Sequence, residues 1–252
     1  MPETEASAVP ETAVSAVPET AVARPVGTMA RMASTTPAPL TVGFDLDMTL
    51  IDSRPGIRAC YQALAERTGT FVDADLAVTR LGPPLAEELR NWFPEDEVPA
   101  MADLYRSMYP TYAIADTPAL PGAREAIAAV QAAGGRAIVV TAKYEPNARL
   151  HLEHLGIEPD AVVGDLWAEA KARALRAYAA GVYVGDHLGD IRAARAADAL
   201  SVTVATGPFG ADELRAAGTD VALADLTAFP RWLAGYLEET DGAPGAPEAA
   251  RA

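Results

Sequence analysis

The stretch TVGFDLDMTLIDSRPG, residues 41–56, places two carboxylates at the end of an apolar run. Residues 41–45 form the first predicted strand, which ends in Asp45, and Asp47 and Thr49 follow at alternate positions. Two carboxylates this close repel each other and raise each other's pKa values. Such a pair is useful where a cation or a reaction needs it, so this stretch indicates both the first strand of the fold and the start of a functional site.

Apolar strands alternate with amphipathic helices along the rest of the chain. The predicted strands cover residues 41–45, 136–141, 161–163, 182–185, 200–204 and 221–223. The predicted helices between and after them cover residues 122–133, 146–155, 168–179, 188–197, 211–217 and 226–237. Short apolar strands separated by helices are typical of a parallel sheet covered on both faces. The sequence therefore predicts an α/β fold, and ligands of such sheets bind beyond the carboxyl ends of the strands.

One interval, residues 53–120, contains helical patterns only. Its first helix begins near Ser53, a suitable N-cap, with Pro55 in the first turn. We expect residues 53–120 to form a small helical domain inserted after the first strand, as a lid over the carboxyl edge of the sheet. The α/β core then consists of residues 40–52 and 121–237.

The two ends of the chain have the composition of disordered tails. Residues 1–39 are rich in Ala, Pro, Thr and Glu and repeat SAVPETAV at 7–14 and 15–22. Two short copies are too few for a solenoid. Met29 and Met32 are alternative translation starts, and residues 238–252 form the second predicted tail.

Composition excludes several classes of partner. The formal net charge is −15, which disfavours binding to nucleic acid or to anionic membranes, since both need basic surface. No apolar run approaches the roughly 18 residues of a membrane span, and no secretory signal is visible. The single cysteine, Cys60, excludes an internal disulfide and suits a reducing compartment, so a cytoplasmic location is expected. Monomer and homodimer both stay open.

Polar side chains follow several predicted strands. Thr141 ends the second strand, Lys171 lies at the start of a helix after the third, and Asp186 and Asp190 follow the fourth. Lys171 is one of only two lysines, with Lys143, among 20 basic residues. Because parallel strands end at one edge, three carboxylates, a hydroxyl and an ammonium are expected to converge there. Packed carboxylates need a cation, and oxygen ligands combined with phosphate suit Mg²⁺.

This combination predicts phosphoryl transfer, which needs positioning and charge neutralisation. One carboxylate of the pair attacks phosphorus to give an aspartyl phosphate. The other donates a proton to the leaving oxygen and later activates water. We expect the carboxylate nearer the cation to stay ionised and the one further away to carry the proton.

The segments FDLDMTLIDS and VGDHLGD, with Thr141 and Lys171 between them, resemble the four ordered motifs of the haloacid dehalogenase superfamily in its phosphatase branch. The resemblance spans about residues 41–237 and is nearest to phosphoglycolate-phosphatase-like members. It implies a three-layer Rossmann-like core with a helical cap inserted after the first motif. It also implies Asp45 as nucleophile and Asp47 as general acid/base.

The resemblance extends to the ligands of the site. Thr141 and Lys171 would bind phosphate. The side chains of Asp45 and Asp186 and the backbone carbonyl of Asp47 would hold Mg²⁺. Asp190 would lie behind these ligands or close to that position, and Thr49 would support the loop after the first strand.

Two positions depart from the pattern, and three lie on the substrate side. Met48 stands where glycine is common, and Ala142 stands where Asn or Ser is common. Arg80 and Gly82 are candidates for a cap loop that dips toward the site. Lys143 either rims the site or is a solvated loop lysine.

Three histidines invite a metal interpretation. His151 and His154 lie three residues apart on a predicted helix, but no third ligand accompanies them, so a packing or surface role is favoured. His187 follows Asp186 directly, at the edge of the expected site.

The leading hypothesis is a Mg²⁺-dependent phosphatase for a small phosphorylated metabolite. A sugar phosphomutase is an alternative, although residues 53–120 contain neither the His nor the Lys that such family members place near the cap entrance. A catalytically idle protein that binds a phosphometabolite is a third reading.

Overall fold

The computed structural model describes residues 39–241. The predicted N-terminal tail with its SAVPETAV repeat, except residue 39, and residues 242–252 of the predicted C-terminal tail lie outside the described residues. Within residues 39–241, no helix is both long and apolar enough to cross a membrane.

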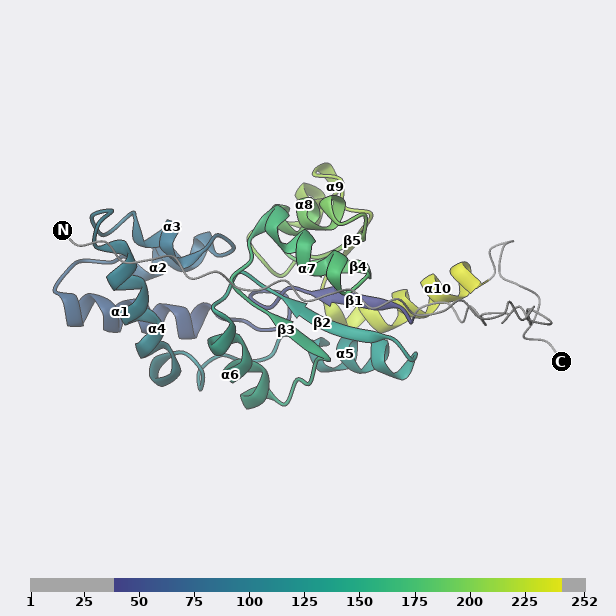
Figure 1. Cartoon of the computed structure of the whole chain (residues 1–252), viewed down its shortest axis with the longest axis horizontal. Helices are drawn as coiled ribbons and strands as arrows, with labels where there is room; N and C mark the ends of the chain where they lie inside the picture. Colours follow the sequence, from purple (N-terminus) through teal and green to yellow (C-terminus); the bar gives the residue numbers. More distant parts are fainter. Residues whose placement is uncertain (1–38, 242–252) are drawn as a thin grey trace, which may run out of the picture. The chain divides into compact units, whose positions relative to one another are not determined.

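Six parallel strands form one sheet, as the alternation of strands and helices predicted (Figure 1). Their spatial order is β3-β2-β1-β4-β5-β6, so the first strand lies in the middle. The strands are β1 (Thr41–Phe44), β2 (Arg136–Val140), β3 (Ala161–Val163), β4 (Ala180–Gly185), β5 (Leu200–Val204) and β6 (Val221–Leu223). The chain order reverses on either side of β1, and ligands of open parallel sheets bind beside such a switch point.

Helices cover both faces of the sheet, which explains why the strands are apolar throughout (Figure 1). Val139 packs on one face, with α5, α6 and α10, while its neighbours Ile138 and Val140 pack on the other, with α7 and α8. The core helices are α5 (Ala123–Ala132), α6 (Glu145–Leu155), α7 (Lys171–Ala177), α8 (Leu188–Ala196), α9 (Ala211–Ala216) and α10 (Phe229–Asp241), with short 3₁₀ turns η2 (Ala168–Ala170) and η3 (Leu226–Ala228). The predicted α/β class is confirmed.

Between β1 and α5 the described chain is helical, with a hydrophobic cluster of its own. Its elements are α1 (Arg54–Thr68), α2 (Ala74–Ala77), η1 (Val78–Arg80), α3 (Leu85–Leu89) and α4 (Val98–Tyr112). α1 packs along α4, where the rings of Tyr61 and Tyr105 are tilted against each other with their centres 4.9 Å apart. We call this segment the helical insertion. Its assignment as a separate cap domain stays a prediction.

Two linkers run side by side where the chain leaves the core and returns. The backbone N–H of Asp52 donates to the carbonyl of Pro118 at 2.9 Å, and that of Leu120 donates to the carbonyl of Leu50 at the same distance. The helical insertion is therefore joined to the core through one narrow double connection.

Two local details differ from the sequence expectations. Ser53 precedes α1 as expected, but it is buried in a helical conformation and its hydroxyl makes no capping hydrogen bond. Pro55 is in the first turn, where its missing N–H costs nothing. At the other end, α10 continues to Asp241, beyond the predicted end of the core at Leu237.

Candidate active site

The side chains expected at the carboxyl edge of the sheet meet there. Asp45 follows β1, Thr141 follows β2 and Asp186 follows β4, and these three strands are neighbours. The backbone N–H of Asp45 still donates to the carbonyl of Val184 at 2.8 Å, so the first carboxylate is fixed by the sheet itself. Carboxylate oxygens of Asp45, Asp186 and Asp190 lie within 4.8 Å of one another.

Lys171 is the centre of this cluster. Its side chain is fully buried, and its Nζ lies 3.0 Å from Oδ1 of Asp45 and 2.8 Å from Oδ1 of Asp190. It also donates to the hydroxyl of Tyr183 at 2.9 Å, which in turn donates to the carbonyl of Val140 at 2.7 Å. Burial alone would lower the pKa of Lys171, but the two carboxylates raise it, so the group stays an ammonium. A buried lysine held in this way is a fixed positive charge.

Asp190 supports the cluster from behind. Its Oδ1 accepts from Lys171 at 2.8 Å, and its Oδ2 accepts from the backbone N–H of His187 at 3.1 Å, at the start of α8. Both oxygens are therefore occupied by protein donors. Although Asp190 is close enough to share a cation, Asp45 and Asp186 are better placed as ligands, as the resemblance implied.

Thr49 joins the loop after β1 to the loop after β4. Its hydroxyl donates to Oδ1 of Asp186 at 2.9 Å in a buried position. The third member of the first motif thus orients a carboxylate from the last, which spacing along the sequence did not reveal. Burial, with Asp190 and Asp45 nearby, raises the pKa of Asp186 well above its usual value.

The two carboxylates of the first motif have opposite environments. Burial raises the pKa of Asp45 to about 7, although Lys171 opposes the shift. Burial also acts on Asp47, but the neighbouring Lys143 ammonium outweighs it and holds the pKa of Asp47 below its usual value. The side chains alone therefore favour protonation of Asp45 over Asp47, the reverse of the order expected from the sequence. A cation beside Asp45 would lower its pKa and restore that order.

The residues present fit a divalent cation. Three buried carboxyl groups face one ammonium, Lys171, so full ionisation of all three would leave two negative charges that a divalent cation neutralises. Carboxylate oxygens of this kind are the donors that Mg²⁺ prefers. The set thus has the charge and the donor type that a magnesium ion requires.

Lys143 is the site residue whose role the sequence left open. Its side chain is 7% exposed, and its Nζ lies 2.8 Å from Oδ1 of Asp47. Its backbone N–H donates to the hydroxyl of Thr141 at 3.2 Å, so the same residue also orients the predicted phosphate ligand. The interpretation as a solvated loop lysine is wrong.

Lys143 also contacts the helical insertion. Its Nζ lies 4.8 Å from the centre of the Tyr109 ring on α4, and the Tyr109 hydroxyl is hydrogen bonded to Nε2 of His151 on α6 at 3.0 Å. His151 is fully buried, while His154 is exposed, so the two histidines do not form a pair. Sequence patterns missed this connection, because it joins residues that are distant along the chain.

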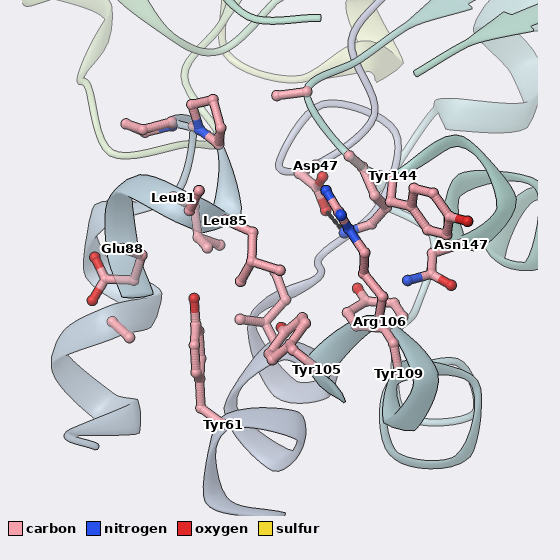
Figure 2. A pocket seen from close by; sticks show the side chains of 18 of the residues that line it. Asp47, Tyr61, Leu81, Leu85, Glu88, Tyr105, Arg106, Tyr109, Tyr144 and Asn147 are labelled. Atoms are coloured by element: carbon pink, nitrogen blue, oxygen red, sulfur yellow. Dashed lines mark ion pairs between the residues drawn. The ribbon is translucent and has the colours of Figure 1, made fainter. Parts of the chain in front are cut away.

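A cavity of about 260 Å³ lies between the helical insertion and the core, beside Asp47 (Figure 2). It is lined by Asp47, Ile57, Tyr61, Ala77, Arg80, Leu81, Gly82, Pro83, Pro84, Leu85, Ala86, Glu88, Tyr105, Arg106, Tyr109, Ala142, Lys143, Tyr144, Asn147 and Asp165. Arg80, Gly82 and Lys143, the expected substrate-side residues, are all among them. Arg80 is bound to Glu88, however, with Nε to Oε2 at 3.1 Å.

Gly82 brings the helical insertion against the core. Its φ is +128°, which only glycine adopts freely, and an added Cβ would lie 2.9 Å from the His187 ring and 3.1 Å from Trp167. His187 also packs between Trp167 and Phe209, with ring centres 5.0 and 4.9 Å away. His187 thus lies at the edge of the site as a packing residue.

The backbone conformation at Met48 shows why glycine is common at this position. Met48 is buried in a left-handed conformation with φ of +59°, which glycine adopts more freely than other residues. Its carbonyl accepts a hydrogen bond from the Thr206 hydroxyl at 2.6 Å, so the turn is held from the loop after β5.

With this geometry in place, comparisons with known proteins identify the family. The haloacid dehalogenase-like hydrolase family profile matches residues 42–195. The chain belongs to this family, and the phosphatase branch expected from the motifs is confirmed.

Individual relatives include two kinds of enzyme. The tyrosine-protein kinase PtkA of Mycobacterium tuberculosis is 32% identical over 205 residues, which cover 76% of this chain and 70% of the relative. The phosphoglycolate phosphatase of Xylella fastidiosa is 33% identical over 194 residues, covering 69% of this chain and 83% of the relative.

Solved structures show the same fold. A crystal structure described as a predicted phosphatase from Clostridium acetobutylicum superposes with a TM-score of 0.68 at 24% identity, covering 78% of this chain and 98% of that one. A haloacid dehalogenase-like hydrolase from Streptococcus pneumoniae gives a TM-score of 0.66 at 21% identity, covering 79% of this chain and 98% of that one.

Proposed function

We propose that the chain is a Mg²⁺-dependent phosphatase that hydrolyses a small phosphorylated metabolite through an aspartyl phosphate on Asp45. The observation that carries this proposal is the cluster of buried carboxylates around the buried ammonium of Lys171, at the carboxyl edge of the sheet. Such a cluster is costly for stability alone, and it suits a dianionic phosphoryl group bound together with a cation.

In the first half-reaction, a carboxylate oxygen of Asp45 attacks phosphorus as the bond from phosphorus to the leaving oxygen breaks. Lys171 and the Thr141 hydroxyl bind phosphoryl oxygens. Asp45 and Asp186, with the backbone carbonyl of Asp47, would hold Mg²⁺, which neutralises charge on the phosphoryl group. In the second half, water attacks phosphorus, the bond to Asp45 breaks, and inorganic phosphate leaves.

Asp47 is proposed as the general acid/base. It gives the leaving oxygen a proton taken up as substrate binds, and it later accepts a proton from the attacking water. The contact with Lys143 holds its carboxylate in one place beside the cavity. The helical insertion acts as the cap, which encloses the leaving group and excludes bulk water.

Phosphoglycolate is one candidate substrate, because a phosphoglycolate phosphatase is among the relatives. The cavity of about 260 Å³ accepts leaving groups of the size of glycolate and somewhat larger ones. We also propose a cytoplasmic location. The single cysteine, Cys60, is a buried free thiol, which suits a reducing compartment.

The test combines purified protein, Mg²⁺ and p-nitrophenyl phosphate, with release of inorganic phosphate as the readout. We expect turnover by the wild type, none with EDTA, and a loss of at least about 10³-fold in Asp45→Asn, whose amide is a poor nucleophile. Wild-type turnover no greater than that of Asp45→Asn contradicts the proposal. With a sugar phosphate as substrate, movement of phosphate within the molecule without its release would instead favour a mutase.

A second candidate is transfer of phosphate to a tyrosine hydroxyl, favoured by the 32% identity to PtkA. The same residues serve this reaction if a phenol replaces water as the acceptor, with Asp47 as the base. The test incubates the protein with Mg²⁺-ATP and a tyrosine-containing peptide mixture and measures phosphotyrosine by mass spectrometry. Phosphotyrosine that requires Asp45 supports transfer, whereas phosphate release alone supports hydrolysis.

A further inference from the structure

Two polar side chains, Asn147 and Arg106, line the cavity from different elements. Asn147, on α6 of the core, is only 5% exposed and lines the cavity. Arg106, on α4 of the helical insertion, also lines the cavity, and its Nε is buried without a hydrogen-bond partner among residues 39–241. A buried polar group without a partner is costly and calls for an explanation.

Arg106 differs from the other cations around the cavity. Arg80 is bound to Glu88 and Lys143 to Asp47. The carboxylate oxygens nearest to Arg106 belong to Asp103 and Asp165, at 3.7 and 3.8 Å, beyond hydrogen-bond distance. Its guanidinium therefore has donors to offer to a ligand.

Both residues contact Tyr144, Arg106 through its side chain and Asn147 through its backbone. The Arg106 guanidinium lies over the Tyr144 ring, 4.9 Å from its centre, and the backbone N–H of Asn147 donates to the Tyr144 carbonyl at 3.0 Å. Figure 2 shows all three on the same side of the cavity as Asp47. Arg106 belongs to the helical insertion and Asn147 to the core, so a ligand between them would contact both parts.

The opposite side of the cavity is apolar and aromatic. It is formed by residues of the helical insertion such as Tyr61, Leu81 and Leu85, with Glu88 beside them (Figure 2). A ligand that fills the cavity therefore meets Arg106, Asn147 and the carboxylate of Asp165 on one side and mainly hydrocarbon on the other.

We propose that Arg106 and Asn147 bind a carboxylate of the leaving group, so that the substrates are phosphate esters of hydroxy acids with an apolar or aromatic body. This rests on the proposed phosphatase function. The planar guanidinium of Arg106 matches a carboxylate in shape and charge. The apolar side favours bodies larger than that of phosphoglycolate, because buried hydrocarbon adds to affinity.

The test compares two aryl phosphates of similar size, 4-(carboxymethyl)phenyl phosphate and 4-propylphenyl phosphate. Wild type should prefer the carboxylate by at least about 10-fold in kcat/KM, since a site built to bind a polar group rejects an analogue without it. In Arg106→Gln this preference should fall to near unity, with Arg106→Lys intermediate. Asn147→Ala should reduce it several-fold.

Arg80→Gln is the matched control, because it removes a second arginine of the cavity that is already bound to Glu88. It should keep the preference, whatever its effect on overall turnover. Equal kcat/KM for both esters in the wild type, or an equal loss for both in Arg106→Gln, overturns the proposal. A larger preference for an ester with a second phosphate in place of the carboxylate also overturns it.

Binding separates this proposal from the catalytic one. Calorimetry with Asp45→Asn and Mg²⁺ measures the affinity for each ester without turnover. We expect the carboxylate ester to bind at least about 10-fold more tightly, and Arg106→Gln in the same background to remove the difference. If wild type fails to hydrolyse any ester, the phosphatase function fails, while the subsite is still supported or contradicted by these affinities.

Discussion

The ammonium of Lys143 lies 2.8 Å from Oδ1 of Asp47, and the pair is nearly closed to solvent. It connects the loop after β2 to the loop after β1, and it holds the proposed acid/base next to the cavity. Tyr109 of the helical insertion contacts the same ammonium. The position of Asp47 thus depends on the core and on the insertion together.

Lys143→Met should lower kcat on p-nitrophenyl phosphate by about 10- to 100-fold with a smaller change in KM, because a general acid/base that is misplaced loses most of its effect. Lys143→Arg should recover part of the loss. Tyr109→Phe is the control, since it keeps the ring beside Lys143. A Lys143→Met enzyme with wild-type kcat would show that the ion pair is not needed to position Asp47.

Gly207→Ala should impair the cation site. An added Cβ at Gly207 would collide with the carboxylate of Asp186. We expect a higher Mg²⁺ concentration for half-maximal activity and a loss of about 1–3 kcal/mol in the free energy of unfolding, as for other overpacked positions. Mg²⁺ titration of activity and urea denaturation measure the two effects.

Gly210→Ala, three residues further along the same loop, is the matched control. The nearest atom to its added Cβ is Oε2 of Glu213 at 3.6 Å, an ordinary contact. It should behave like wild type in both measurements. If Gly207→Ala shows the same Mg²⁺ requirement as Gly210→Ala, the close approach to Asp186 does not matter for the site.

Gly82→Ala should weaken the contact between the helical insertion and the core. The added Cβ would press on His187 and Trp167, and the backbone would be strained at φ of +128°. We expect KM for small phosphate esters to rise by about 10-fold, because the cavity depends on this contact.

Gly69→Ala separates strain from contact. Its φ is +71°, but nothing lies within 4 Å of an added Cβ. It should cost about 1 kcal/mol of stability through strain and leave KM unchanged. Equal KM values for the two variants would mean that the packing of Gly82 on the core does not control substrate binding.

His151 should make the fold sensitive to acid. Burial, with Lys143 nearby, lowers the pKa of His151 to about 3, against an ordinary value of 6.5. Between these values the unfolded chain binds a proton that the folded protein does not. Stability is therefore unaffected above pH 6.5 and falls as the pH decreases toward 3, by about 1 kcal/mol per pH unit.

His151→Gln should remove this contribution while keeping a hydrogen-bonding group near Tyr109. Urea denaturation at pH 7, 6, 5 and 4 measures it. His154→Gln, on the exposed side of the same helix, controls for the loss of an imidazole. A wild-type slope in His151→Gln would mean that His151 is not buried in its neutral form.

The order of the elements and the convergence of Asp45, Lys171 and Asp186 followed from the sequence alone. Strands and helices leave periodic patterns, and a parallel sheet brings the ends of its strands to one edge. The family, and with it the phosphatase branch, followed from four short motifs in order.

The partners of each side chain needed the tertiary structure. That Lys143 binds Asp47, that Thr49 binds Asp186, and that Arg106 and Asn147 share one side of the cavity depend on residues brought together from separate loops and helices. The pattern of apolar and polar residues along a sequence indicates burial and secondary structure. It does not show which distant side chain contacts a given residue. The sequence by itself therefore determined the fold and indicated the proposed reacting groups. The tertiary structure decided which side chains pair with one another and which ones line the cavity.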